Sequence, residues 1–388
     1  MHRTACHEGP ADIVIQRRRF LELGIAGCTA FCLGCDSAPG AGGKAAFAAD
    51  RGPVEARFYE KLGNGMVQCH VCPRECVIEN NGRGWCRTRE NRSGTLYTLV
   101  WGQVASMNVD PIEKKPFFHV LPGSKAFSIA TVGCNIECKF CQNWTISQAS
   151  PGELQSRFMT PDDIVDMTKR SKSASIAYTY SEPTVFTEYV YDCSAAGKGA
   201  GVHSVVVSNG YVNREPVERL CEVITAYKVD LKAFSRRFYT EVTGGNLDSV
   251  LETIKLLKKK GVWLEIVHLT IPTLNDSDSD FAAMADWLLS VAGAFVPVHF
   301  TRFHPEYKLT NLPVTPVSTL ERARAILMGK GMKFVYVGNI PGHPGESTYC
   351  PKCGKKIIER GFGYSVGAIT MKNGTCGFCG TPIPGVWA

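Results

Sequence analysis

Residues 133–144 read GCNIECKFCQNW and place Cys134, Cys138 and Cys141 within eight positions of one another. The stretch follows AFSIATV, residues 126–132, an apolar run typical of a buried β-strand. Three thiolates on one loop can hold three corners of a [4Fe–4S] cluster and leave one iron without a protein ligand, whereas a structural centre takes a fourth thiolate. The spacing therefore predicts an open iron where a second molecule binds, and disfavours a structural zinc site.

Downstream of this loop, short β-rich runs alternate with amphipathic helical patterns. The predicted helix in residues 160–172 has Thr160 as its N-cap and Pro161 at its first position, and the one in residues 250–261 ends in lysines and Gly261. Strands are predicted at 126–132, 174–180, 203–209, 226–232, 262–271 and 296–303, and residues 333–339 extend the sheet edge. This alternation predicts an α/β fold with a parallel sheet, a partial (β/α)6 TIM-like barrel. The cysteine loop then lies at the carboxyl ends of the strands, where ligands of such folds bind.

Two further cysteine groups flank the predicted barrel. Residues 69–86, CHVCPRECVIENNGRGWC, contain Cys69, Cys72, Cys76 and Cys86, which suit a tetrahedral zinc ion or a small iron–sulfur centre, with His70 as a substitute ligand. Near the C-terminus, CPKC and CGFC supply Cys350, Cys353, Cys376 and Cys379, a pattern typical of a zinc ribbon with a structural zinc ion. Cys193 and Cys221 lie in helical patterns and are interpreted as core residues.

Composition sets the outer limits of the interpretation. The chain has 388 residues, 44% of them hydrophobic, and a net charge of +7 with scattered basic residues, which does not favour nucleic-acid binding. We predict four regions: a leader and linker at 1–50, an N-terminal cysteine-rich module at 51–125, the barrel at 126–340 and a zinc-ribbon-like module at 341–388. No segment has the ~20 uninterrupted apolar residues of a membrane span.

The N-terminus bears on the compartment. RRRFLELGIAGC begins with arginines and continues as an apolar run, and AAFAAD supplies an A-x-A site at residues 46–48, as in a Tat-type export signal. A lipobox-like IAGC ending at Cys28 competes with that cleavage site. The predicted chemistry favours the cytoplasm instead, so the compartment stays open between cytoplasmic function and export or inner-membrane association.

The C-x3-C-x2-C motif, with Phe140 before its third cysteine, resembles the signature of the radical S-adenosylmethionine (SAM) superfamily. The resemblance implies that Cys134, Cys138 and Cys141 are cluster ligands, that Phe140 packs beside the adenine, and that the open iron chelates SAM. In that family, one electron from the reduced cluster cleaves SAM to methionine and a 5′-deoxyadenosyl radical, which abstracts hydrogen from the substrate.

The same resemblance assigns SAM contacts at three strand ends. In YTYSEPT, residues 178–184, Ser181 and Glu182 stand where the family has a Gly-Gly-Glu-Pro element that binds the SAM amino group. Asn209 in VSNG faces the ribose, and the lysine of DLK, residues 230–232, reaches the SAM carboxylate. The further candidates share strand positions near the predicted mouth; they are Asp230, Lys232, His304, Arg302, His268 and Glu265.

Taken together, the motifs look like those of the AmmeMemoRadiSam-system radical SAM enzymes, often described as pyruvate formate-lyase-activating-enzyme-like. That resemblance covers nearly everything after residue 57 and implies Memo-like and AMMECR-like partner proteins. A low-potential electron donor such as a ferredoxin or flavodoxin is also expected. Two other functions stay open: activation of a glycyl-radical enzyme, and a non-catalytic iron–sulfur or zinc protein serving electron transfer or scaffolding.

Overall fold

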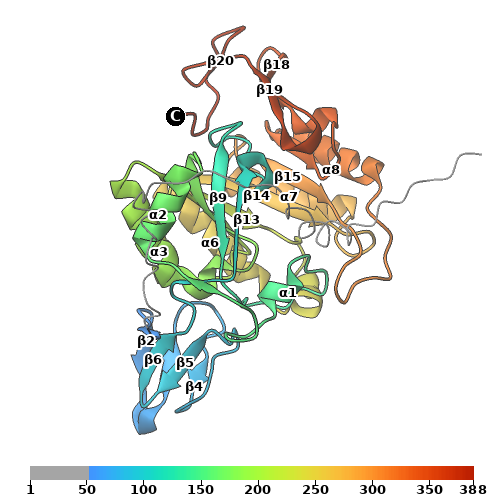
Figure 1. Ribbon diagram of the computed structural model, residues 1–388. Coiled ribbons are helices and arrows are strands. Elements are labelled where there is room, and N and C mark those ends of the chain that lie inside the picture. Colours follow the sequence, from blue (N-terminus) through green and yellow to red (C-terminus); the bar gives the residue numbers. More distant parts are fainter. Residues whose placement is uncertain (1–51) are drawn as a thin grey trace, which may run out of the picture. The chain divides into compact units, whose positions relative to one another are not determined.

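One eight-stranded sheet organises the part of the chain that the computed structural model describes, residues 52–388. The predicted leader at residues 1–50 lies outside this range. In spatial order the strands are β16, β15, β14, β13, β12, β11, β9 and β8 (Figure 1). Their bounds are Ser106–Pro111 (β8), Lys125–Ala130 (β9), Ser175–Tyr178 (β11), His203–Ser208 (β12), Ala226–Asp230 (β13), Trp263–Thr270 (β14), Val298–Arg302 (β15) and Val335–Gly338 (β16).

The seven strands from β9 to β16 are mutually parallel, which confirms the six predicted repeats and the additional edge strand. Strand β8 was not predicted; it pairs antiparallel with β9, from Ser106 opposite Ala130 to Pro111 opposite Lys125. Its sequence, SMNVDP, is half exposed and lacks the apolar alternation that marks a strand. Because β8 and β16 do not pair with each other, the sheet stays open, as in a partial barrel.

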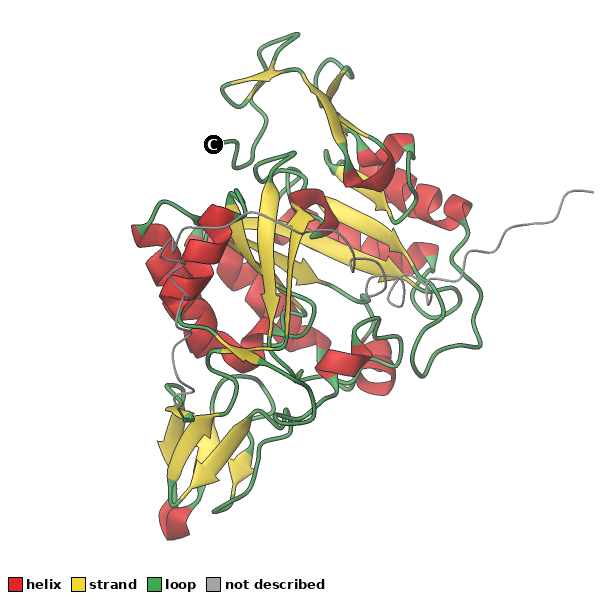
Figure 2. Cartoon of the chain, in the orientation of Figure 1, coloured by secondary structure: helices red, strands yellow, loops and turns green. Residues whose placement is uncertain are grey.

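Helices connect the parallel strands (Figure 2). The long ones are α2 (Pro161–Arg170), α3 (Thr187–Gly199), α4 (Arg214–Cys221), α6 (Leu247–Lys260), α7 (Asp278–Val291) and α8 (Val317–Gly329); α1 (Trp144–Ser147) and α5 (Arg236–Phe238) are short. The predicted capping is confirmed: Thr160 accepts from the Asp163 amide at 3.2 Å, and α6 ends at Gly261 with φ of 73°, a left-handed conformation that glycine adopts without strain.

Successive side chains along each strand point to opposite faces of the sheet. One face packs against the helices, and the other faces the inside of the partial barrel. On β13, Tyr227 and Val229 pack in the main core with the helices, whereas Lys228 and Asp230 face the opposite side. The buried helix side is apolar and gives the sheet its stability. The opposite side therefore carries the polar groups that can meet a ligand.

Short strands make up the flanking regions, where the cysteine modules were predicted. The N-terminal ones are Val54–Glu55 (β1), Tyr59–Lys61 (β2), Val67–Cys69 (β3), Val77–Ile78 (β4), Arg89–Arg92 (β5), Thr95–Thr98 (β6) and Gln103–Val104 (β7), and the last of these pairs with Arg157–Phe158 (β10). The C-terminal ones are Thr348–Tyr349 (β17), Lys356–Arg360 (β18), Val366–Ile369 (β19), Met371–Lys372 (β20) and Thr375–Cys376 (β21). Since β8 lies within residues 51–125, the predicted N-terminal region also contributes an edge strand to the main sheet.

Buried charge attaches the N-terminal strands to the barrel. Arg89 on β5 donates two hydrogen bonds to Glu188 on α3, at 2.8 and 2.7 Å, and both side chains are 1% exposed. Breaking such a buried pair by removing one partner leaves an uncompensated charge and costs about 3–5 kcal/mol. The N-terminal strands and α3 are thus expected to fold together.

His268 on β14 lies on the helix side of the sheet, against Phe281 and Phe300, and is 2% exposed. Burial lowers the pKa of His268 to about 3. In the unfolded chain a histidine has a pKa near 6.5, whereas the buried ring of the folded protein stays neutral at that pH. The contribution of His268 to the free energy of unfolding is therefore fully present above about pH 6.5 and is lost as the pH falls, because the unfolded state binds the proton first.

We therefore expect the free energy of unfolding to fall by about 2 kcal/mol between pH 6.5 and pH 5 through His268 alone. His268→Leu should remove that contribution and leave a shallower pH dependence. Urea unfolding of both proteins at several pH values measures the difference. If the free energy of unfolding of the two proteins fell equally steeply with pH, His268 would not be buried as a neutral group.

Candidate active site

A cavity of about 450 Å³ opens at the carboxyl ends of the strands. Every predicted cluster or SAM residue except His304 lines it. These residues are Cys134, Cys138, Phe140, Cys141, Ser181, Glu182, Asn209, Asp230 and Lys232. Parallel strands deliver these groups from separate segments to one mouth, as the sequence predicted.

The cysteine loop is held by backbone contacts from two directions. The amides of Glu137 and Lys139 donate to the carbonyls of Thr243 and Val242 at 2.8 and 3.0 Å. Gly133 begins the loop with φ of 97°, and a Cβ there would lie 2.4 Å from the Thr88 side chain. Only glycine permits this close approach of the loop to the N-terminal strands.

Burial raises the pKa of the Cys138 thiol to about 12 and that of Cys134 well above its usual range. Thiolates at these positions therefore need a nearby positive charge or a bound metal. Three thiols on one loop, all lining one cavity, match the donors that a [4Fe–4S] cluster with one open iron requires. Ser181 also lines the cavity with a buried Oγ that has no hydrogen-bond partner among residues 52–388, so a polar ligand would satisfy it.

Glu182 joins the ends of two strands. Its Oε1 accepts hydrogen bonds from the Thr184 amide at 3.0 Å, the Thr184 hydroxyl at 2.7 Å and the Ser208 hydroxyl at 2.7 Å. Its Oε2 accepts from the Asn209 amide at 2.9 Å and keeps room for another donor. Burial raises the pKa of Glu182 above its usual value, and these donors act in the opposite direction. The carboxylate therefore fixes the strand ends and presents one oxygen to the cavity.

A lysine–aspartate–lysine cluster lies at the end of β13. Asp230 contacts Lys228 at 2.9 Å and Lys232 at 3.3 Å. Burial opposes ionisation of Lys232, but the Asp230 carboxylate and the Cys138 thiolate raise its pKa above the usual value. The Lys232 ammonium also lies 5.8 Å from the Phe140 ring centroid. A protonated lysine is thus maintained beside the cysteine loop.

The cavity can now be compared with known proteins. A family model described as the radical SAM superfamily matches residues 128–288, from β9 into α7. The chain belongs to the radical SAM superfamily.

The chain is also similar to two curated proteins. The uncharacterized protein MJ0808 of Methanocaldococcus jannaschii is 45% identical over 330 residues, 85% of this chain and 98% of its own. Pyruvate formate-lyase 1-activating enzyme of Escherichia coli K12 is 25% identical over 222 residues, 53% of this chain and 89% of its own. This chain is thus a radical SAM enzyme similar to activating enzymes, of a superfamily that uses a [4Fe–4S] cluster and SAM.

Solved structures are more distant. A radical SAM methyltransferase from Sphaerobacter thermophilus covers 76% of this chain and 80% of its own, with 15% identity and a TM-score of 0.47. SuiB of Streptococcus suis bound to SAM covers 62% of this chain and 56% of its own, with 13% identity and a TM-score of 0.45. Similarity at this level carries over neither a substrate nor a partner.

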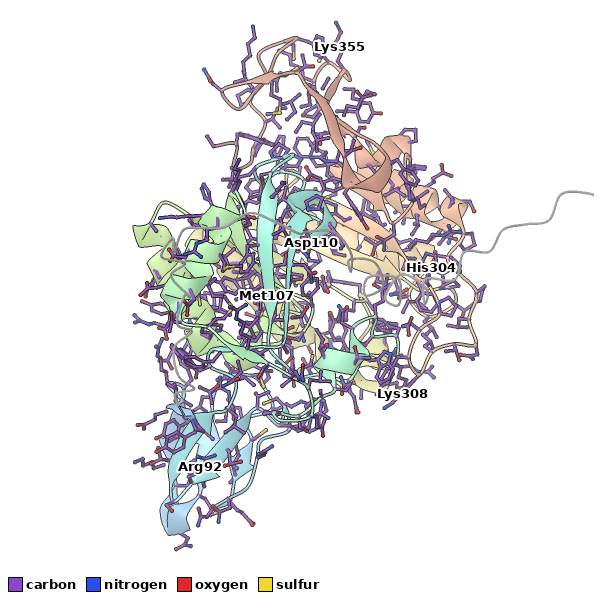
Figure 3. All side chains as sticks on the ribbon, in the orientation of Figure 1. Arg92, Met107, Asp110, His304, Lys308 and Lys355 are labelled. Atoms are coloured by element: carbon purple, nitrogen blue, oxygen red, sulfur yellow. The ribbon has the colours of Figure 1, made fainter. Side chains whose placement is uncertain are left out.

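Four candidates from the sequence lie away from the cavity wall. His304, beyond the end of β15, is exposed, and Arg302 turns outward to donate to the Thr315 carbonyl at 2.8 Å (Figure 3). His268 faces the helices, as described above. Thr301, the neighbour of Arg302 on β15, lines the cavity, so alternation places Arg302 on the other face of the sheet.

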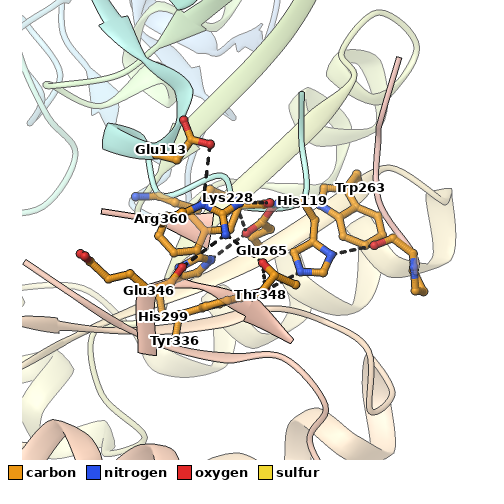
Figure 4. Close-up of polar contacts among 12 residues, drawn as sticks. Glu113, His119, Lys228, Trp263, Glu265, His299, Tyr336, Glu346, Thr348 and Arg360 are labelled. Atoms are coloured by element: carbon orange, nitrogen blue, oxygen red, sulfur yellow. Dashed lines mark hydrogen bonds and ion pairs between the residues drawn. The ribbon is translucent and has the colours of Figure 1, made fainter. Parts of the chain in front are cut away.

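Glu265 faces the interior of the sheet but belongs to a buried network below the cavity (Figure 4). It accepts from the Phe118 and His119 amides at 3.0 and 2.9 Å and from His299 at 2.7 Å. Arg360, on β18, donates to the Phe118 carbonyl at 2.6 Å. These contacts tie the C-terminal strands to the base of the barrel, so Glu265 acts as a structural anchor.

Sequence reasoning missed a group contributed by β8. Tyr180 and Lys115 line the cavity, and both contact Asp110 of β8; the Lys115 to Asp110 distance is 2.5 Å, and the Tyr180 hydroxyl donates a hydrogen bond to the same carboxylate. Burial lowers the pKa of Lys115 to about 8, although Asp110 opposes this. The signal, DPIEKKP at residues 110–116, is a run of charges in an unpredicted strand and turn, which resembles an ordinary solvated loop.

Tyr180 has φ of 65°, in the left-handed region where a side chain is strained by about 1–2 kcal/mol. On the motif resemblance it stands where the Gly-Gly-Glu-Pro element has its first glycine, and its contacts with Asp110 and with Lys115, whose Nζ lies 4.2 Å from the ring centroid, offset the strain.

Tyr180→Gly and Tyr180→Ala both lose the ring and the hydroxyl, but only glycine accepts this φ without strain. We expect the alanine variant to be less stable than the glycine variant by about 1 kcal/mol. Thermal unfolding of the two variants side by side checks the difference. An alanine variant as stable as the glycine variant would contradict the strained conformation.

Proposed function

We propose that Cys134, Cys138 and Cys141 ligate the [4Fe–4S] cluster of this enzyme and that the surrounding cavity binds SAM. The supporting observation is that one cavity at the strand ends gathers the three thiols together with a carboxylate and a protonated lysine. When bound, cluster and SAM supply reductive cleavage of the sulfonium to a 5′-deoxyadenosyl radical that abstracts hydrogen from a substrate. The fold we propose is the superfamily's partial (β/α)6 barrel, with residues 126–340 as its core.

Each side chain then has a defined role at the cavity. Oε2 of Glu182 accepts a hydrogen bond from the SAM ammonium group, and Ser181 adds a neutral hydrogen bond beside it. The Lys232 ammonium pairs with the SAM carboxylate, while Asp230 keeps that lysine protonated. Phe140 provides an apolar surface for the adenine, and Asn209 a polar contact for the ribose. These groups hold and orient SAM.

The substrate side is the edge of the cavity formed by Lys114, Lys115 and Tyr180. Lys114 is 47% exposed there, so this edge is open to a large substrate. Similarity to the Escherichia coli activating enzyme supports a second candidate function, formation of a glycyl radical on a partner protein. A low-potential ferredoxin or flavodoxin is the proposed electron donor, and Memo-like and AMMECR-like proteins are proposed partners. Among residues 52–388 no helix is long and apolar enough to cross a membrane.

Anaerobic reconstitution, reduction with dithionite and chromatography of the products test the reaction. The wild-type protein should release 5′-deoxyadenosine from SAM, and Cys138→Ala should release none, because the cluster loses one of three thiolates. Cys193→Ala is the matched control, since Cys193 is fully buried on α3. Product from Cys138→Ala at the wild-type rate would overturn the assignment of the cluster ligands.

Glu182→Gln tests the SAM contact separately. The substitution removes the negative charge and replaces one of the two acceptor oxygens with a donor, so SAM affinity should fall by about 2 kcal/mol, the size of a charge-assisted hydrogen bond, with the loop cluster retained. Isothermal titration with SAM measures the change.

Thr184→Val is the control for the Glu182 experiment. It removes one donor to Oε1 without altering the charge, and Thr184 does not line the cavity. Equal losses of affinity in the two variants would show that Glu182 acts only by fixing the strand ends.

A further inference from the structure

A second cavity lies within the N-terminal strands and the adjoining loops. Cys69, Cys72, Cys76 and Cys86 line it, and so does Asn135, the residue that follows Cys134. We propose that this cavity holds a second [4Fe–4S] cluster, ligated by the four cysteines, rather than a zinc ion. The inference rests on the proposed function only in taking the Cys134 loop as a cluster site.

Sulfur spacing separates the two kinds of centre. Four thiolates around one zinc ion, with zinc–sulfur bonds of about 2.3 Å, bring their sulfur atoms to roughly 3.8 Å from one another. The C-terminal set has this geometry: its four ligand atoms lie within 4.8 Å, with Cys350 to Cys379 at 3.6 Å and Cys353 to Cys376 at 3.8 Å. Within residues 52–388, it is the only group in which three or more ligand atoms converge so closely.

The N-terminal cysteines converge on one cavity without such close spacing. In a [4Fe–4S] cluster each thiolate binds a different iron, so the sulfur atoms stay further apart than around a single ion. The three loop cysteines of the radical SAM site are likewise not among the groups of the described chain whose ligand atoms all lie within 4.8 Å. The N-terminal set therefore resembles the cluster loop and not the zinc-ribbon set.

The surroundings suit a cluster with a net negative charge. The Trp85 amide donates to the Cys76 sulfur at 3.5 Å, and Cys86 contacts the Thr88 hydroxyl at 3.2 Å. Hydrogen bonds to sulfur are among the features that tune iron–sulfur clusters. Arg74 also lines the cavity; its guanidinium lies over the Trp85 ring at 3.5 Å and donates to the Asn135 and Gly244 carbonyls, both at 2.6 Å.

The two cysteine sites share a wall. Asn135 accepts from Asn209 at 2.9 Å on the SAM side, and its carbonyl accepts from Arg74 at 2.6 Å on the N-terminal side. A Cβ on Gly133 would lie 3.1 Å from the Cys86 carbonyl oxygen. The second cavity therefore borders the cysteine loop directly, through Asn135.

The full chain with all three loop cysteines replaced, Cys134→Ala with Cys138→Ala and Cys141→Ala, tests the proposal. After anaerobic reconstitution we expect about four iron and four sulfide per chain, with one zinc, and an electron paramagnetic resonance signal on reduction. A variant with no iron and about two zinc ions, or with only about two iron, would overturn it. Cleavage of SAM by the wild-type protein is measured separately, so failure of the proposed function is distinguishable.

A second variant, altered at the N-terminal cysteines and not at the loop, keeps the proposal testable if the first variant does not fold. Cys72→Ala with Cys76→Ala should lower the iron content from about eight to about four per chain and keep the zinc. Cys353→Ser is the matched control, which should lose zinc and keep all the iron. Iron that stays at about eight per chain in the double variant would overturn the proposal.

Discussion

Buried thiols next to a buried lysine set the electrostatics on which the site depends. Cys138 is 7% exposed, and its thiolate is costly without a compensating charge. Lys232 supplies that charge, and Asp230 makes the ammonium stable despite its own burial. A lysine without Asp230 would tend to lose its proton, since burial lowers the pKa of an amine. Asp230 and Lys232 of the DLK element therefore already form a charged pair beside the cysteines before any ligand binds.

The same logic explains why so much charge lies beneath the cavity. Lys228 contacts Asp230 from the strand interior, and below them Glu265, His299 and Arg360 form the buried network that ties in the C-terminal strands (Figure 4). Buried ionic groups are tolerated only when each is paired and hydrogen-bonded. The C-terminal strands thus supply Arg360 as a charged partner for the buried acidic groups of the barrel. This pairing attaches the strands to the barrel without requiring a bound metal ion.

The sequence predicted the parallel strands well because their apolar runs and helix caps are local signals. It predicted the cavity residues of the cysteine loop and of β11 to β13 because parallel strands end at one edge, so a residue just after each strand must lie there. It missed β8 and the Asp110, Lys115 and Tyr180 group, since the pairing of a half-exposed edge strand is a long-range event. His304 was misplaced relative to the wall because the strand ends at Arg302, and alternation does not extend past a strand's end.

Tyr180 illustrates how the departure from the superfamily pattern is accommodated. On the motif resemblance, Tyr180 stands where the Gly-Gly-Glu-Pro element has its first glycine, and Tyr180 adopts a left-handed backbone at a cost in strain. The cost is offset by contacts with Asp110, which lies on the edge strand β8. The unpredicted strand and the missing glycine are therefore two parts of one arrangement, in which an edge strand stabilises a strained residue and that residue places a phenol ring in the cavity. Comparison of the motif sequence alone finds only that a glycine is missing. The structure shows the contacts of Tyr180 with Asp110 that compensate for the missing glycine.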